Sequence, residues 1–293
     1  MVSKIPIIKQ CTVSHNQQQG DLMVEDLASY LDRNKNLIFP HRHNFYHFLL
    51  FTKGGGRHSI DFETFTVAPW QIYFMAPGQI HVWQFDEDVD GFVVNFNKDY
   101  FKTLLLRPAY IDQFSFFSGL VKDEVFTVDE AERTAVVNIF ERLRGNVQDT
   151  EFAQISLLYL FHVLEKQRML PQEVEGNAYN HTLLRNFMGL IEVNFRELRL
   201  PKEYAALLYI TPNHLNALCK AFLGLSAGEL IRDRILLEAK RLLVIPDYAI
   251  SSIAYELNFN DNSYFTKFFK KAVGKTPDEF RRSIDLINKQ DGK

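Results

Sequence analysis

The chain of 293 residues has little cysteine and no long apolar run. Its two cysteines, Cys11 and Cys219, stand at unrelated positions and exclude a disulfide framework, so we expect a protein of the reducing cytoplasm. No apolar run approaches the length of a membrane span, and the opening segment MVSKIPIIKQ lacks the apolar centre of a signal peptide. We therefore expect neither secretion nor a membrane partner.

Motifs for catalysis and phosphate binding are also scarce. The run Gly54-Gly55-Gly56 lacks the lysine and hydroxyl residue that follow the glycines of a phosphate loop, and we interpret it as a hairpin turn. The acidic run at 86–90 is interpreted as a solvated loop rather than a catalytic carboxylate pair, and no nucleophile elbow occurs. We therefore expect no enzyme activity and no cofactor.

Charge is distributed unevenly along the chain. Residues 183–293 contain 17 Lys and Arg against 13 Asp and Glu, whereas the remainder contains 16 against 23. The overall net charge of −3 thus hides a basic module of +4 beside an acidic one of −7. Because 46% of the residues are apolar, two domains with separate cores are expected.

Residues 248–281 predict a helix, a short turn and a second helix with two contrasting faces. The first helix has a buried stripe at Ile253, Ala254 and Leu257. At 100° per residue, the apolar side of the second helix collects Tyr264, Phe265, Phe268, Phe269, Ala272 and Val273. Its polar side collects Asn262, Ser263, Thr266, Lys267, Lys270 and Lys271. Such a polar side suits base edges and phosphates, although a solvated surface helix has the same pattern.

A second copy of this arrangement lies upstream. Residues 201–208 predict a short helix, and Thr211 followed by Pro212 predicts the capped start of another. The buried stripe of that helix is Leu215, Leu218, Cys219 and Phe222, and its outward face is Asn213, Asn216, Ala217 and Lys220. A long helix, opened by a capping box at Ser226 and Glu229, joins the two copies. Its eighteen or so residues span about 27 Å, near the ~34 Å between successive major-groove faces.

Residues 183–282 resemble the C-terminal DNA-binding domain of the AraC/XylS family of bacterial transcription regulators. The segments that carry the resemblance are SSIAYELNF and SYFTKFFKKAVGKTPDEFR. The resemblance implies double-stranded DNA and RNA polymerase as partners. It implies base or backbone contacts at Asn213, Asn216, Ala217, Lys220, Asn262, Ser263, Lys267 and Lys270. Lys271 lies beside Lys270, close to the expected groove wall.

Three positions depart from the family pattern. Asn258 replaces the usual glycine after the helix, and asparagine can also adopt the left-handed conformation that this turn needs. Ala249 replaces a serine N-cap, which removes a contribution of roughly 1 kcal/mol. Ala217 stands where many members carry arginine, so we expect the first recognition helix to read DNA more weakly than the second.

The N-terminal half predicts a small antiparallel barrel or jelly roll. Short runs rich in aromatic and β-branched residues occur at 45–52, 59–67, 70–75, 81–85 and 91–96. A helix with Val136, Val137, Phe140 and Leu143 on one face follows. Residues 152–164 are apolar nearly all round, which predicts a helix shared between the barrel and a second copy of the chain in a homodimer. We place a sensor and dimerisation domain at 1–170, a linker at 171–182 and a DNA-binding domain at 183–293.

Residues 40–56 and 76–83 resemble the cupin-like sensor domain of AraC-family regulators. The metal-binding positions of enzymatic cupins correspond to His41, His43, His47 in place of glutamate, and His81. Four imidazoles could hold zinc, iron or copper, or could serve as polar groups of an effector pocket without a metal, which is the reading we adopt. The aromatic residues expected near them are Phe45, Tyr46, Phe48, Phe74 and Trp83.

These patterns predict an α+β protein with a cupin-like β-barrel, a helical dimerisation segment and an all-α double helix-turn-helix domain. The predicted function is DNA-binding transcription regulation under control of a small-molecule effector whose identity the sequence does not reveal. Two alternatives stay open: a metal-dependent cupin enzyme or metal sensor fused to a DNA-binding domain, and an architectural DNA binder that needs no ligand.

Overall fold

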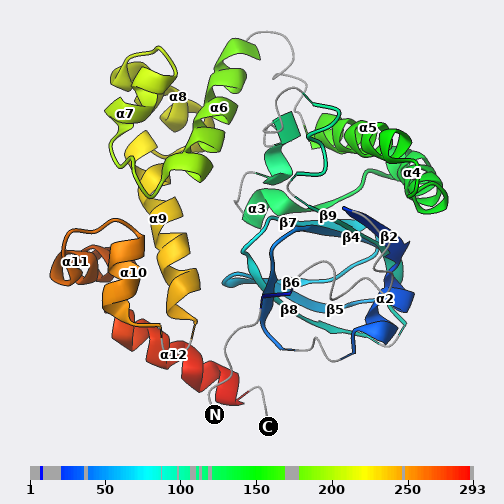
Figure 1. The fold of residues 1–293 in the computed structure, drawn as a ribbon, viewed down its shortest axis with the longest axis horizontal. Helices are drawn as coiled ribbons and strands as arrows, with labels where there is room; N and C mark the ends of the chain where they lie inside the picture. Colours follow the sequence, from blue (N-terminus) through cyan, green and yellow to red (C-terminus); the bar gives the residue numbers. More distant parts are fainter. Residues whose placement is uncertain are drawn as a thin grey trace. The chain divides into compact units, whose positions relative to one another are not determined.

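A computed structural model describes residues 7–8, 21–35, 39–86, 88–97, 99–105, 110–111, 114–117, 121–168, 178–245 and 248–290. The chain divides into two compact units, one comprising Pro6–Ala178 and the other containing Tyr179–Lys293. Figure 1 shows the first as a sheet structure with covering helices and the second as helices alone. No helix in the described parts of the chain is long and apolar enough to cross a membrane.

Two five-stranded sheets build the N-terminal unit. The first has the order β1 (Ile7–Ile8), β3 (His41–His43), β8 (Ile80–Phe85), β5 (Gly56–Ile60) and β6 (Glu63–Thr66). The second has the order β10 (Val125–Thr127), β7 (Gln71–Met75), β4 (Tyr46–Lys53), β9 (Asp90–Phe96) and β2 (Leu22–Asp26). All pairs are antiparallel except β1 with β3. The predicted cupin-like sheet architecture is confirmed.

Two details of the strand prediction are wrong. The run at 59–67 is not one strand, because Asp61 adopts a left-handed φ of 53° and turns the chain between β5 and β6. The three glycines do not form a hairpin, since they connect β4 to β5 in different sheets. Gly56, with φ of 111°, passes so close to the chain that an added Cβ would lie 2.3 Å from the Gln84 carbonyl oxygen.

Strand β4 is buried on both faces, which explains its unbroken apolar sequence. Tyr46 and Phe48 point toward a core shared with the helices, whereas His47 and Leu49 point into the space between the sheets. The helices over the outer face are α4 (Arg133–Gly145) and α5 (Thr150–Arg168), as Figure 1 shows. Smaller elements are α2 (Leu27–Arg33), η2 (Ser115–Phe117), α3 (Val121–Glu124) and η3 (Glu130–Glu132).

Helix α5 has one face inside the domain and one face outside it. Phe161 and Leu164 are fully buried in the domain's own core, so they are not available to a second copy. Ile155 and Tyr159 remain 53% and 60% exposed, and Leu158 is partly buried. The exposed apolar surface of α5 is thus a narrower stripe than the sequence predicted.

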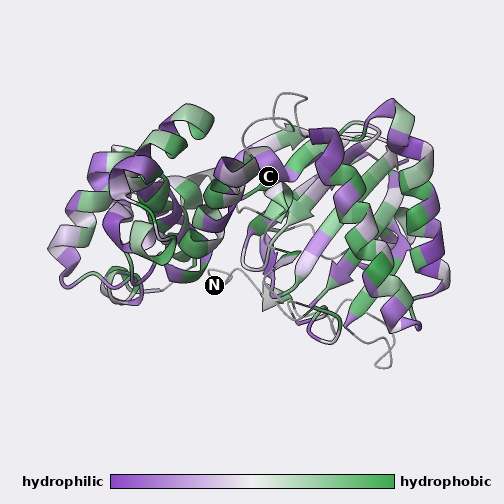
Figure 2. Ribbon diagram, turned by 90° about the horizontal axis from the view of Figure 1, so that it is seen from above, coloured by the Kyte–Doolittle hydropathy of each residue, from purple (hydrophilic) through white to green (hydrophobic). Residues whose placement is uncertain are grey.

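The C-terminal unit contains α6 (Ala178–Asn194), α7 (Pro201–Leu207), α8 (Pro212–Leu223), α9 (Ala227–Leu243), α10 (Ile250–Glu256), α11 (Asn262–Val273) and α12 (Pro277–Gln290). Helix α6 begins inside the segment predicted as linker. Figure 2 shows hydrophobic and hydrophilic residues alternating along these helices, as amphipathic helices around one core require. Residues of α9 that the core encloses include Ile231, Ile235, Ala239 and Leu243.

Candidate nucleic-acid interface and histidine cluster

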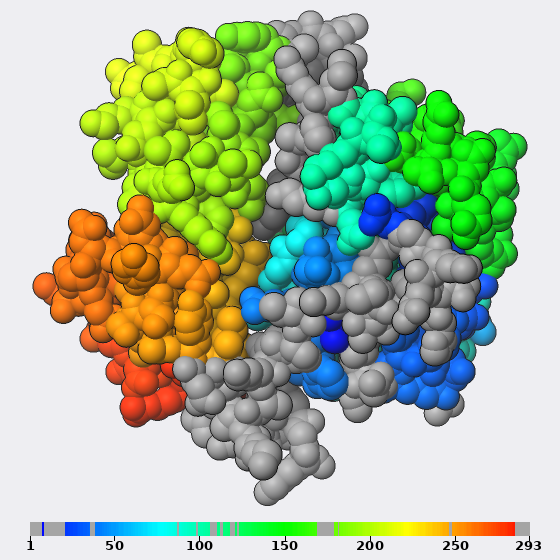
Figure 3. Space-filling model, in the orientation of Figure 1, coloured from blue at the N-terminus to red at the C-terminus, as the bar shows by residue number. Residues whose placement is uncertain are grey.

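The two helix pairs α7–α8 and α10–α11 repeat the same turn. Tyr209 and Asn258 follow the first helix of each pair with φ of 56° and 57°. The next residue donates its amide to a carbonyl five residues back, Ile210 to Ala205 at 3.0 Å and Phe259 to Ala254 at 2.9 Å. The predicted left-handed conformation of Asn258 is confirmed. Figure 3 shows the first pair in yellow-green and the second in orange on the same face of their unit.

The second helix of each pair is capped at both ends. The Thr211 hydroxyl accepts a hydrogen bond from the His214 amide at 3.2 Å, as predicted. The Asp261 carboxylate accepts one from the Tyr264 amide at 2.9 Å, a cap that our sequence analysis missed. Both helices end at a left-handed glycine, Gly224 and Gly274. Ala249 caps α10 without a side-chain hydrogen bond.

Helix α8 presents fewer polar groups than its sequence predicts. Asn213, Ala217 and Lys220 are exposed. Asn216 is half-buried, and its side-chain oxygen accepts a hydrogen bond from the Ala227 amide at 3.0 Å. Because this oxygen caps the start of α9, it is occupied within the domain, and only the amide nitrogen of Asn216 remains for another partner.

Helix α11 presents a longer polar face. The exposed side chains that the sequence predicted there are Asn262, Ser263, Lys267, Lys270 and Lys271. Phe265 and Phe269 are fully buried, but Tyr264 is 61% exposed and Ala272 is exposed, so their assignment to the apolar face is wrong. Tyr264 and the exposed His214 of α8 are candidates for DNA contact that the sequence analysis missed, and their position near a helix start was the available signal.

The lysines of the exposed faces of α8 and α11 are free of direct ion pairs. In the parts of the chain that the structure describes, Lys220, Lys267, Lys270 and Lys271 take part in no salt bridge, whereas arginines of the same unit do. Ammonium groups on an exposed helix that are not held in salt bridges are suited to phosphate oxygens.

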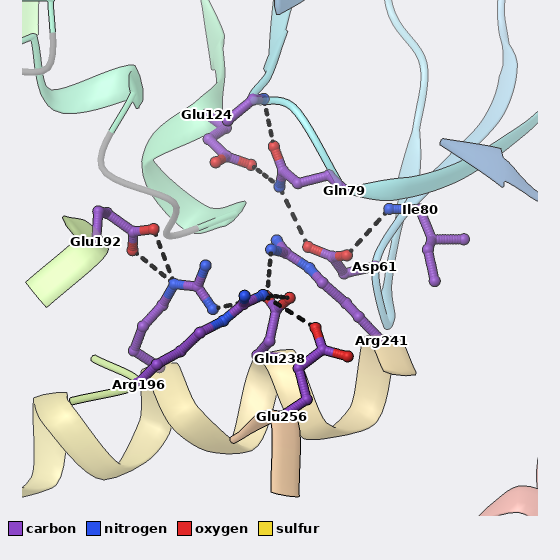
Figure 4. Close-up of polar contacts among 11 residues, drawn as sticks. Asp61, Gln79, Ile80, Glu124, Glu192, Arg196, Glu238, Arg241 and Glu256 are labelled. Carbon is purple, nitrogen blue, oxygen red and sulfur yellow. Dashed lines mark hydrogen bonds and ion pairs between the residues drawn. The ribbon is translucent and has the colours of Figure 1, made fainter. Parts of the chain in front are cut away.

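A partly buried ionic network joins α6, α9 and α10. Arg234 on α9 contacts Glu192 of α6 at 2.8 Å and Glu238 at 3.1 Å. Arg196 contacts Glu238 at 3.2 Å and Glu256 of α10 at 3.3 Å, and Figure 4 shows it between the two carboxylates. Burial alone would raise the pKa of Glu238, but the surrounding arginines lower it below its ordinary value. The network therefore holds α6, α9 and α10 in one arrangement.

Five histidines meet between the two sheets of the N-terminal unit. His41 and His43 share one face of β3, and His41 is paired with His81 across to β8. The ring centroids of His81 lie 4.2 Å from those of His41 and 4.7 Å from those of His43. His47 joins them from the opposite sheet, with its ring 4.8 Å from His43. The four predicted histidines are thus brought together.

The fifth histidine, His58, was missed by sequence analysis because it lies outside the two cupin-like segments. Its Nε2 lies 3.2 Å from Nδ1 of His81. Among the predicted aromatic residues, Phe45 and Trp83 border the cluster, with ring centroids 4.4 Å from His43 and 5.1 Å from His41 respectively. Phe74 does not: it pairs with Phe48 and packs against the helices. Its assignment to the pocket is therefore wrong, as are those of Tyr46 and Phe48.

Burial keeps these imidazoles neutral. It lowers the pKa of His47 to about 4 and that of His58 to about 3. It also lowers the pKa of His41, and it places those of His43 and His81 well below the ordinary value. At neutral pH each ring therefore retains one nitrogen lone pair.

Two family models match successive parts of the chain. The AraC-like ligand binding domain matches residues 28–161, and the helix-turn-helix domain matches residues 204–283. The first match contains the histidine cluster, and the second begins in α7 and ends in α12.

Known proteins and solved structures are similar over the same regions. The HTH-type transcriptional activator RhaS of Salmonella agona (strain SL483) is 22% identical over 266 residues, covering 85% of this chain and 90% of that protein. The RhaS of Enterobacter sp. (strain 638) is 22% identical over 263 residues, covering 84% and 89%. The C-terminal domain of AraT from Geobacillus stearothermophilus is 28% identical, covers 34% of this chain and 84% of that one, and has a TM-score of 0.33. ToxT from Vibrio cholerae is 14% identical, covers 89% and 97%, and has a TM-score of 0.42.

A ligand-binding domain followed by a double helix-turn-helix domain defines a DNA-binding transcription regulator. The ligand-binding domain matches the AraC-like model, and the helix-turn-helix model follows it along the chain. The chain belongs to the AraC/XylS family of bacterial transcription regulators.

Proposed function

We propose that this regulator reads double-stranded DNA mainly with α11, more weakly with α8, and changes its occupancy of DNA when an effector binds between the sheets of the sensor domain. The observation that carries the proposal is the exposed face of α11, whose lysines form no salt bridge in the described structure. The proposal includes action in the cytoplasm together with RNA polymerase.

Base reading is assigned to the start of α11. Asn262 and Ser263 occupy its first turn, and Lys267 follows on the same exposed side. In helix-turn-helix proteins the N-terminal part of the second helix contacts base edges, and amide and ammonium groups are the donors that purines accept. Lys270 and Lys271 lie one turn further on, where the phosphates of the groove wall are expected.

Helix α8 is assigned a weaker role. Ala217 offers no polar group, and the oxygen of Asn216 is engaged with Ala227. Asn213, His214 and Lys220 remain exposed and can contact the DNA backbone. The 17 residues of α9 span roughly 25 Å between the two pairs, a separation that suits neighbouring major-groove segments.

We further propose that the sensor domain forms a homodimer through α5. Ile155 and Tyr159 are large apolar side chains that remain more than half exposed on one helix face. Two linked DNA-binding domains would then occupy paired sites with a raised effective concentration. Replacement of both residues by aspartate should convert the dimer to a monomer, as measured by light scattering. A wild-type monomer at micromolar concentration would refute this part.

The test of DNA reading begins with the DNA that co-purifies with the protein in cells, whose sequence identifies a cognate site. Asn262→Ala and Lys267→Ala are then compared with Lys166→Ala, which removes an exposed lysine of α5 in the sensor domain. We expect the first two variants to lose affinity for the cognate site and the third to retain it. Equal behaviour of all three would contradict the proposed interface.

A further inference from the structure

The histidine cluster contains more unsatisfied nitrogen than any other part of the described structure. Among its ten ring nitrogens, the six without a hydrogen-bond partner are Nε2 of His41, Nδ1 and Nε2 of His43, Nε2 of His47, Nδ1 of His58 and Nε2 of His81. Buried polar groups are ordinarily hydrogen-bonded, so a concentration of this kind indicates a partner that the chain itself does not supply.

The hydrogen bonds that do exist determine which nitrogens carry lone pairs. Nδ1 of His41 lies 2.9 Å from the Phe39 carbonyl oxygen. Because a carbonyl can only accept, this Nδ1 bears the proton and Nε2 carries the lone pair. Nδ1 of His47 is held in the same way by the side-chain oxygen of Asn95, which leaves its Nε2 as the lone-pair nitrogen.

His58 and His81 share one hydrogen bond, so one of them donates and the other accepts. If Nδ1 of His81 donates to Nε2 of His58, then Nε2 of His81 carries a lone pair. His81 would then carry its lone pair on Nε2, as His41 does, and the ring centroids of the two residues lie 4.2 Å apart. Metal-binding imidazoles in proteins are oriented by this kind of hydrogen bond at their second nitrogen.

We propose that His41, His43 and His81 hold a divalent late first-row transition metal ion, such as Zn²⁺ or Co²⁺, and that His58 orients His81 for this role. The inference deepens the proposed function, since it rests on the barrel being the sensor and makes the metal ion the effector or a part of its site.

The arrangement of the three histidines is near to that of a metal site. One ligand nitrogen from each of the three residues lies within 4.8 Å of the others. Two nitrogens that share a tetrahedral zinc ion at about 2.1 Å lie about 3.4 Å apart, so the nitrogens that are furthest apart need to approach one another by up to about 1.4 Å when the ion binds. His47, from the opposite sheet, is not one of the three, and its ring centroid lies 4.8 Å from that of His43.

The chemistry of the cluster selects among cations. Neutral imidazoles favour zinc, copper, nickel and iron, whereas magnesium and calcium require oxygen ligands. Our sequence analysis had adopted the metal-free polar pocket, and the inference replaces that interpretation.

The experiment uses full-length protein freed of metal by a chelator and titrated with Co²⁺, whose visible absorption reports imidazole coordination. We expect one equivalent of Co²⁺ to bind and to be displaced by Zn²⁺. His81→Ala should weaken binding at least 100-fold, and His41→Gln, which keeps the size and polarity of the site, should do the same if the alanine variant does not fold. The matched control, His162→Ala, removes an exposed histidine of α5 and should leave Co²⁺ affinity unchanged.

The role of His58 has its own test. His58→Leu should weaken Co²⁺ binding by about 10- to 100-fold, the effect typical of losing a group that orients a ligand. His58→Gln keeps an acceptor for His81 and should restore most of the affinity, which a merely space-filling role would not explain.

Absence of the Co²⁺ absorption, or equal spectra for wild type and the His81 and His41 variants, would overturn the inference. Because no DNA is present, that failure is separate from failure of the proposed function, which would appear as unchanged DNA affinity in the α11 variants.

Discussion

The two domains carry unsatisfied polar groups in opposite places. The sensor domain buries neutral imidazoles of which six ring nitrogens lack hydrogen-bond partners, whereas the DNA-binding domain exposes lysines that form no salt bridge in the described structure. In each domain these groups suit a ligand from outside the chain, and the chemistry of that ligand can be inferred from the chemistry of the groups. Lone pairs in a dry interior suit a metal cation, and ammonium groups on a helix surface suit a polyanion.

The interior of the DNA-binding domain sharpens this contrast. Its buried charges, Glu238 and Arg234 among them, are paired with one another. A domain whose buried charges are paired, and whose exposed recognition-helix lysines form no salt bridge in the described structure, is organised for binding at its surface. The sensor domain is organised for binding in its interior, since its polar groups without hydrogen-bond partners are buried there.

The largest effect that we expect is a loss of stability as the pH falls, greater in the sensor domain than in the DNA-binding domain. In metal-free protein, His47 and His58 have folded-state pKa values of about 4 and about 3, below the ordinary 6.5 of the unfolded chain. The unfolded state therefore binds more protons as the pH falls below 6.5, and the sensor domain loses stability until the pH passes the folded values. Between pH 7 and pH 5 the loss should be on the order of 3 kcal/mol.

This loss can be measured in one domain at a time, because both tryptophans, Trp70 and Trp83, lie in the sensor domain. The midpoint of urea unfolding, followed by tryptophan fluorescence, should move to a lower urea concentration in acid. When the DNA-binding domain is followed separately by its helical signal, its unfolding midpoint should move less, since His214 is already exposed. Equal shifts in both domains would remove the distinction between their interiors.

The next largest effect concerns base reading by α11. Lys267→Ala should cost on the order of 1 to 3 kcal/mol at the cognate site and little on random DNA, because a directional base contact discriminates by that amount. Competition binding with cognate and random duplexes would measure both. A uniform loss on the two DNAs would reassign Lys267 to phosphate contact.

A smaller, different effect is expected one turn further along the helix. Lys270→Ala should weaken cognate and random DNA alike and reduce the slope of log affinity against log salt by about one unit, since one counterion fewer is released. Titrations at several salt concentrations supply the slope. An unchanged slope would show that Lys270 does not reach the DNA.

The smallest effect concerns stability. Ala249→Ser should supply the side-chain cap that α10 lacks and stabilise the DNA-binding domain by at most about 1 kcal/mol. Thermal unfolding of the variant should show a small upward shift with unchanged DNA affinity. A destabilised variant would show that the hydroxyl does not cap α10.

The helical half was largely predictable because its signals are local. The caps at Thr211 and Ser226, and the left-handed turn at Asn258, depend on residues within a few positions of one another. Tyr264 was misplaced because its helical angle lies at the border of the apolar face, where a large amphipathic ring can remain exposed. The ionic network at Glu238 joins distant helices and left no local pattern.

The sheet half was less predictable because its contacts are not local. Strand β7 is apolar on both faces, so alternation alone could not show that Phe74 faces the helices rather than the cluster. His58 meets His81 only through the pairing of β5 with β8. The motif-based residues His41, His43 and His81 were predictable because they occupy positions of a known pattern.

The central claim is that α11 reads bases and does not merely contribute charge. The most direct test exchanges Ala217→Lys with Lys267→Ala in one protein, because these positions lie on the exposed faces of α8 and α11 and the net charge is conserved. The account predicts that the exchanged protein loses roughly 10- to 100-fold in affinity at the cognate site while its binding to random DNA is unchanged. Full retention of cognate affinity would contradict it.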